Sequence, residues 1–321
     1  MQSYIERSRQ IRNLSMPPEN KEHFYGQFRV NFLQIRELFA ENRAYLNDEV
    51  FTPLKDIDAI SEEKAQELLE LSDNLAYTET LEMVDVRLAF FIVNALEPYY
   101  EKRGNREKYI HCLFRREMLA YNVGQIFDRG RLTDVLAGRY RGYILACAEK
   151  ASVFLDDVDG FAALPDKTQE ELLNIELFRA TGYERPYYDE QLILRQIGSY
   201  QRYIRRLLDP AIRKAAPNIK WDKQLYSAYT YLMDVQEFLD WHETPDFILR
   251  MLDDAGDQAL ALMKKNGTTN QRDPGAVLSS KKAIGFYRGT TSFEEMVQQY
   301  VDWETDYAAN IRRKSKAAGD I

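Results

Sequence analysis

The amino-acid sequence predicts an all-α protein. Apolar residues recur every three or four positions in almost every part of the 321-residue chain, which is the spacing of one face of a helix. No stretch alternates apolar and polar residues over more than a few positions, as a half-buried strand would. The 15 Gly and 10 Pro are too few for the many turns of a β-sandwich or barrel. We therefore expect about eleven helices.

The first half of the chain contains the expected helices 21–47, 61–76, 80–103, 105–128 and 131–155. The first has an apolar stripe at helical spacing, made of Phe24, Phe28, Phe32, Ile35 and Phe39. The third repeats the spacing with Leu81, Val84, Leu88, Phe91 and Ala95. Gly104 is predicted to end the third helix, because glycine readily takes the left-handed conformation found there.

The second half contains the expected helices 166–180, 187–208, 219–242, 245–265, 276–288 and 292–313. One stripe consists of Ile193, Ile197, Tyr200, Ile204 and Leu207. The next consists of Leu225, Ala228, Leu232, Val235 and Leu239. Gly160, Gly182 and Gly289 are further predicted helix ends.

Capping residues predict several helix starts. Thr168 with Glu171, and Ser292 with Glu295, have the spacing of a capping box, in which a hydroxyl and a carboxylate satisfy free backbone N–H groups. Thr244 and Asp209 each precede a proline, and proline is tolerated in the first turn because its missing N–H is not needed there.

The longest break in the helical pattern covers residues 266–281 and contains several turn-forming residues. The sequence therefore predicts a helical body at 1–265, a loop or hinge at 266–281, and a C-terminal helix pair with a basic tail at 282–321.

Charge and cysteine content indicate the class of partner and the compartment. The 43 basic and 51 acidic residues give a net charge of −8, which disfavours nucleic acid as a partner. Cys112 and Cys147 are too few for a disulfide framework. The N-terminus lacks the apolar core of a signal peptide, and no run approaches the roughly 18 apolar residues of a membrane span. We expect a cytoplasmic protein that binds no membrane.

One local excess of positive charge stands out against this acidic background. Eight basic residues and only two acids lie between positions 195 and 223; the basic ones are Arg195, Arg202, Arg205, Arg206, Arg213, Lys214, Lys220 and Lys223. Two interpretations are open: a solvated helix face or a local anion site.

The segment Leu96 to Tyr109 resembles the turn of a tetratricopeptide repeat, with an aromatic pair, Gly104, an Asn and a following Lys. The segment Ala283 to Met296 is similar. The repeat is degenerate, since Tyr109 replaces the usual Ala and no strict 34-residue period is visible. The resemblance implies antiparallel helix hairpins stacked as a superhelix that holds a peptide, a partner protein or a small ligand. Such arrays are found in bacterial signalling proteins, including those with a diguanylate-cyclase-type output domain.

A cluster of acidic residues suggests one enzymatic alternative. Asp253, Asp254 and Asp257 form an Asp-Asp-x-x-Asp sequence, which resembles the clusters that hold Mg²⁺ in all-α isoprenoid synthases. The family's basic residues around the diphosphate are missing, however. His23, His111 and His242 are scattered, and no nucleophile elbow or phosphate loop is present. The sequence thus predicts no cofactor and no catalytic residue, and it favours a non-enzymatic role.

Tyrosine and arginine are the preferred anchors of protein interfaces, and they gather in one part of the chain. The candidate partner-binding groove consists of Tyr200, Arg202, Tyr203, Arg206, Tyr226 and Tyr229. The same residues are equally suited to helix–helix packing. Our leading hypothesis is a protein-interaction or sensory scaffold in bacterial signalling. The alternatives are the magnesium-dependent isoprenoid enzyme and a structural oligomer, of which a homodimer is the simplest form.

Overall fold

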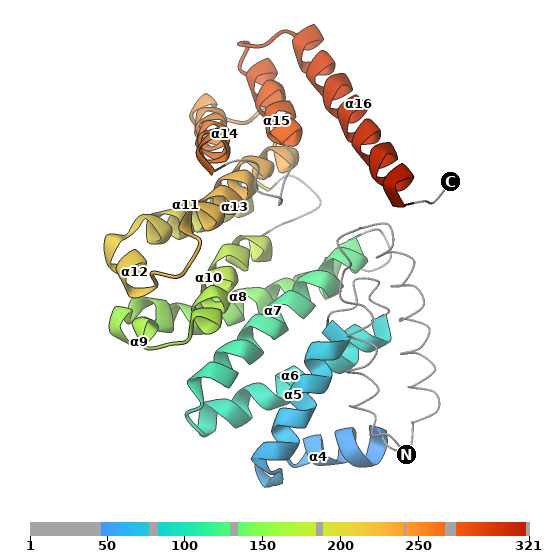
Figure 1. Ribbon diagram of the computed structural model, residues 1–321, viewed down its shortest axis with the longest axis vertical. Coiled ribbons are helices and arrows are strands. Elements are labelled where there is room, and N and C mark those ends of the chain that lie inside the picture. Colours follow the sequence, from blue (N-terminus) through green and yellow to red (C-terminus); the bar gives the residue numbers. More distant parts are fainter. Residues whose placement is uncertain are drawn as a thin grey trace. The chain divides into compact units, whose positions relative to one another are not determined.

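The computed structural model describes residues 46–76, 83–128, 134–183, 189–240, 242–266 and 274–318 (Figure 1). These residues form helices and connecting turns and contain no strand, so the all-α prediction is confirmed for this part of the chain. Residues 21–45 of the predicted helix 21–47 lie outside the described residues. Within the described ranges, no helix combines the length and apolar character needed to cross a bilayer.

The chain divides into two compact units, which we describe separately. Unit 1 comprises residues 1–147 and 313–321, and unit 2 comprises residues 148–312. The loop predicted at 266–281 is helical from Pro274 onward, because helix α15 covers Pro274–Tyr287. The proposed division of the chain at this loop stays a prediction.

Unit 1 begins with short turns and continues with long helices. A π-helical turn covers Asn47–Phe51, α4 covers Thr52–Lys55, and a 3-10 turn covers Ile57–Ala59. The long helices are α5 (Glu62–Ala76), α6 (Met83–Lys102), α7 (Arg106–Asp128) and α8 (Asp134–Asp156), the last of which continues into unit 2. Their bounds confirm the four predicted helices to within three residues.

Helix α6 is the central element of unit 1. It packs against both α5 and α7, and its side chains Ile92, Val93 and Leu96 are fully buried. Gly104 ends it with φ of 66°, as the sequence predicts. The Asn105 N–H then donates to the Tyr100 carbonyl at 3.1 Å, and the Gly104 N–H donates to the Glu101 carbonyl at 3.1 Å. This Schellman geometry reverses the chain so that α7 returns along α6.

An ion cluster joins α5 to α7 in the interior of unit 1. Arg115 donates through Nε to Asp73 at 2.7 Å, and Nε2 of His111 lies 2.9 Å from the same carboxylate. Burial opposes the charged form of Asp73, but the contacts with His111 and Arg115 outweigh it and hold the pKa of this carboxyl below its ordinary value. The Asp73 carboxylate therefore joins α5 to α7 through its contacts with His111 and Arg115.

The described residues of unit 2 form eight α-helices beyond the end of α8. They are α9 (Val158–Ala162), α10 (Asp166–Phe178), α11 (Glu190–Leu208), α12 (Pro210–Ala215), α13 (Trp221–Asp234), α14 (Asp246–Asn266), α15 and α16 (Phe293–Ala318). The last residues of α16 fall in unit 1. Two 3-10 turns, Arg179–Tyr183 and Val235–Phe238, follow α10 and α13.

Several predicted helix ends in unit 2 are wrong. The helix predicted at 219–242 stops at Asp234 and becomes a 3-10 turn, after which Leu239 is extended. Gly160 lies inside α9 rather than at a helix end, since Asp157 caps that helix by accepting from the Gly160 N–H. Gly182 lies within a 3-10 turn after the end of α10. Sequence patterns detect a helix face better than they detect where the last turn tightens.

The predicted caps are confirmed in two cases and wrong in two. Ser292 and Glu295 form the reciprocal capping box, and Asp209 caps α12, a helix that the apolar pattern did not predict. Thr168 is buried inside α10, whose N-cap position is occupied by Pro165. The hydroxyl of Thr244 donates to the Asp240 carbonyl at 2.7 Å and so closes a turn instead of capping α14.

The core of unit 2 is built from neighbouring helices. Helix α13 packs against α11 and α14, and α14 packs against α15. The contact between α14 and α15 is close at Gly256, where an added Cβ would lie 2.7 Å from Cγ of Lys281.

Two glycine substitutions in unit 2 should change stability in opposite directions. Gly289 ends α15 with φ of 72°, so Gly289→Ala should lower the free energy of unfolding by about 1 kcal/mol. Gly198 is exposed within α11 and has open space around it, so Gly198→Ala should raise that free energy by about 0.5–1 kcal/mol. Urea unfolding of both variants measures this. If the free energy of unfolding changed in the same direction for both variants, the backbone conformations that we describe for Gly198 and Gly289 would be contradicted.

The Asp73 cluster should give unit 1 a specific acid sensitivity. Because the pKa of Asp73 is lower in the folded state than in the unfolded chain, its stabilisation is complete above the unfolded value near 3.8 and is lost as the pH falls through the folded value. We expect Asp73→Asn to cost about 2 kcal/mol at neutral pH and less as the pH falls below about 4. Asp48→Asn, at an exposed carboxylate, is the control. A pH-independent loss measured by urea unfolding would contradict the assignment.

Candidate ligand-binding site

The tyrosines of the predicted groove lie mostly in the interior of unit 2. Tyr200, Tyr203 and Tyr226 are 2%, 0% and 1% exposed. The hydroxyl of Tyr203 donates to Oε1 of Gln224 at 3.0 Å, and burial raises the pKa of that phenol. Tyr229 is half-buried, and burial raises its pKa also. Three of these four rings therefore pack in the core and present little surface to a partner.

The two arginines of the predicted groove are engaged within unit 2. Arg202 pairs with the fully buried Glu176 at 3.1 Å, and Arg179 pairs with the same carboxylate at 3.1 Å. Arg206 donates to the Leu155 carbonyl at 2.8 Å and to Asp156 at 2.7 Å. Because these acceptors lie at the C-terminal end of α8, Arg206 supplies the positive charge that a helix end favours.

The predicted residues therefore do not form one groove. Arg202 and Arg206 border a hollow of about 350 Å³ beside the end of α8, together with the exposed Arg205. Tyr226 lines a different and larger pocket, whereas Tyr200, Tyr203 and Tyr229 line neither of the two.

The carboxylates of the Asp253 cluster are bound by cations of the protein. Lys281 lies 2.5 Å from Asp253 and 2.9 Å from Asp257, and Arg288 lies 2.7 Å from the second oxygen of Asp253. These contacts raise the pKa of Lys281 despite its partial burial. Asp254 is exposed on another side of α14. Nowhere in the described part of the chain do three or more His, Cys, Asp or Glu side chains gather as a metal ion would require.

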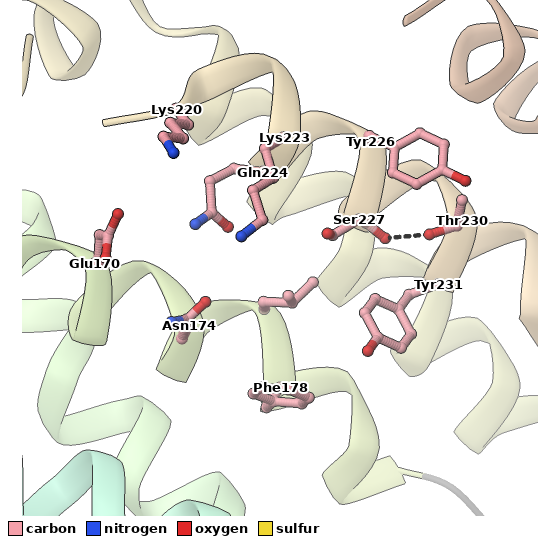
Figure 2. A pocket seen from close by; sticks show the side chains of 11 residues that line it. Glu170, Asn174, Phe178, Lys220, Lys223, Gln224, Tyr226, Ser227, Thr230 and Tyr231 are labelled. Carbon is pink, nitrogen blue, oxygen red and sulfur yellow. Dashed lines mark hydrogen bonds between the residues drawn. The ribbon is translucent and has the colours of Figure 1, made fainter. Parts of the chain in front are cut away.

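The larger pocket, of about 630 Å³, lies between α10 and α13 within unit 2 (Figure 2). Helix α10 contributes side chains at positions 170, 174, 177 and 178, and α13 with its N-cap contributes positions 220, 223, 224, 226, 227, 230 and 231. Both sets follow the spacing of a helix face, so each helix presents one side to the cavity.

One end of the pocket is charged. Glu170 and Asn174 extend from the first turns of α10, and across the cavity Lys220, Lys223 and Gln224 extend from the start of α13 (Figure 2). Glu170 and the two lysines are exposed. Among the described residues none of these three charged side chains has an ion-pair partner within 4.0 Å.

The other end of the pocket is aromatic. Phe178 of α10 and Tyr231 of α13 meet there with ring centroids 6.2 Å apart at 62° (Figure 2). The ring of Tyr231 also stacks on the buried Tyr200 at 6.4 Å, which fixes its position. Thr230 also lines the pocket and donates its hydroxyl to the Ser227 carbonyl at 2.9 Å.

The lining is suited to binding. It combines ammonium, amide and carboxylate groups with aromatic rings, and it includes neither His nor Cys. The charged groups lie at one end, where they can orient a small ligand or a short peptide, and Ser227 and Thr230 add polar groups nearer the aromatic end.

The sequence contains two signals for this site, and the other lining residues were not predicted. Lys220 and Lys223 belong to the basic stretch for which an anion site was one interpretation, and Tyr226 was a predicted groove residue. The lining residues of α10 could not be predicted, because nothing in the sequence indicates which helix packs opposite α13.

Comparison of the chain with protein-family models, curated proteins and solved structures gives no match.

Proposed function

We propose that this protein is a non-catalytic helical scaffold of the tetratricopeptide-like type, which binds a partner protein segment or a small ligand in the pocket between α10 and α13. The signalling role and the cytoplasmic location predicted from the sequence rest on the resemblance and composition alone, and they are part of this proposal.

The packing of successive helices supports the superhelix. In unit 1, α6 contacts the helix before it and the helix after it, and α5 also contacts α7. In unit 2, α14 contacts α13 and α15 in the same manner. Packing of this kind between sequence neighbours is expected of a helical repeat and supports the proposal.

The observation that carries the binding function is the pocket itself. Its volume of about 630 Å³ falls within the range of roughly 300–1,000 Å³ that ligand pockets occupy. Its charged end can orient a bound group, and its aromatic end can bury one. The magnesium alternative lacks such support, because Lys281 and Arg288 already neutralise Asp253.

Filling the pocket should abolish binding without unfolding the protein. Random peptides displayed on phage and selected on the full chain should yield binders that lose at least about tenfold in affinity for Asn174→Trp, since a tryptophan at this half-buried lining position occupies the cavity. Gln191→Trp, at an exposed position of α11 outside the pocket, is the matched control. Equal binding to both variants would contradict the proposal, and no enrichment of any peptide would contradict its form in which a protein segment is the ligand.

A second candidate function, self-association, is favoured by one observation on α16. Its side chains Phe293, Val297, Tyr300 and Val301 are 60%, 39%, 37% and 51% exposed and follow helical spacing. Contiguous apolar surface of this kind marks association sites. Pairing of two copies through α16 would make the protein a homodimer.

Light scattering tests this candidate directly. We expect a dimer for the natural chain and a monomer for Val297→Lys, because a charge buried at an apolar interface disrupts it. Gln298→Lys, at the neighbouring exposed position, should stay dimeric. A natural chain that is monomeric at all concentrations rules out this role.

A further inference from the structure

The strongest unexplained feature of the molecule is the pair of lysines at the pocket entrance. Elsewhere in unit 2 several basic side chains are paired: Arg202 with Glu176, Arg206 with Asp156, and Lys281 with Asp253. Lys220 and Lys223 both line the cavity, yet within the described residues neither has an ion-pair partner within 4.0 Å.

The position of these lysines is also unfavourable for the helix that carries them. Lys220 is the N-cap residue of α13 and Lys223 lies in its first turn, where the helix dipole repels positive charge at a cost of about 0.3–1 kcal/mol for each. Asp222 is in the same turn, but its carboxylate accepts from Lys265 at 2.9 Å and from Asn266 at 3.1 Å. Local violations of this kind are expected at functional sites.

We infer that the pocket between α10 and α13 binds a small organic monoanion, namely a carboxylate carried on an aromatic or branched apolar body. The inference rests on the proposed binding function and specifies its ligand. The carboxylate lies between Lys220 and Lys223, and the apolar body extends toward Phe178 and Tyr231 (Figure 2). Both pocket walls run from their polar to their aromatic residues in the same direction, so one short molecule can reach both ends.

The charge balance of the pocket selects a single negative charge. Lys220 and Lys223 contribute two positive charges and Glu170 contributes one negative charge, so the net charge of the lining is +1. A carboxylate neutralises this excess. A phosphate monoester carries close to two negative charges at neutral pH, so its second charge meets Glu170 without a matching cation. Asn174 and Gln224 supply amide groups for the remaining hydrogen bonds.

A set of probes that share one ring isolates the contribution of the charged group. The probes are 3-phenylpropanoate, its neutral amide 3-phenylpropanamide, and phenyl phosphate, with propanoate as the probe that lacks the ring. Binding to the full chain is followed by ligand-observed NMR titration. We expect 3-phenylpropanoate to bind at least about fivefold more tightly than the amide and than propanoate.

Substitutions at the pocket then assign the charge to particular residues. Lys220→Gln and Lys223→Gln should each weaken 3-phenylpropanoate about threefold, while Glu170→Gln should strengthen it about twofold. The gain in affinity expected for Glu170→Gln is decisive, because a variant that folds poorly would bind more weakly and not more tightly. Lys214→Gln makes the same charge change at an exposed position outside the pocket and should have no effect.

The outcomes separate this inference from the proposed function. Equal affinity for the carboxylate and the amide, or no gain for Glu170→Gln, overturns the anion assignment. If peptides selected on the full chain bind while no small probe does, the ligand class is wrong and the proposed function stands. If the probes bind but Asn174→Trp does not prevent it, the pocket is not the site and both are wrong. A dipeptide ending in phenylalanine with a free carboxylate tests whether the ligand is the C-terminus of a peptide. We expect it to bind less tightly than 3-phenylpropanoate, because the inferred ligand is a free small molecule.

Discussion

Burial of helix faces against other helices is the constraint on which the described part of this structure depends. An isolated helix of this length is marginal in water, so helices such as α6 and α14 persist because two neighbours cover them. That requirement explains the composition, since large apolar and aromatic side chains recur at helical spacing in the described part of the chain. It also explains why the few glycines with positive φ, Gly104 and Gly289, lie where the chain must reverse.

Several polar groups at these helix contacts are paired, and the pairs tie helices together. Asp73 joins α5 to α7, Glu176 joins α10 to α11 through Arg202, and Asp253 joins α14 to α15. Arg206 of α11 contributes by neutralising the end of α8. Because a buried charge without a partner is costly, such groups are committed to structure and are poor candidates for ligand binding. Charged side chains that are not committed in this way are better candidates for ligand binding, and in unit 2 Glu170, Lys220 and Lys223 line one cavity.

The candidate groove read from the sequence failed for the same physical reason. Tyr200 and Tyr203 have the residue type of an interface anchor, but they follow the apolar stripe of α11 and are therefore buried by its packing. Arg206 has the charge of an anion site, yet its guanidinium is used at the end of α8. Residue type alone does not separate an anchor from a core residue, since both roles favour the same side chains.

The sequence by itself determined the helical class, the spans of most helices and the glycine turns, because these depend on local spacing and backbone conformation. It also marked Lys220 and Lys223 as part of a basic stretch. Only the tertiary structure decided that Asp253 is neutralised by Lys281 and Arg288 and that α10 faces α13. Which helix faces which depends on contacts between residues far apart in the chain, and local periodicity carries no information about those contacts.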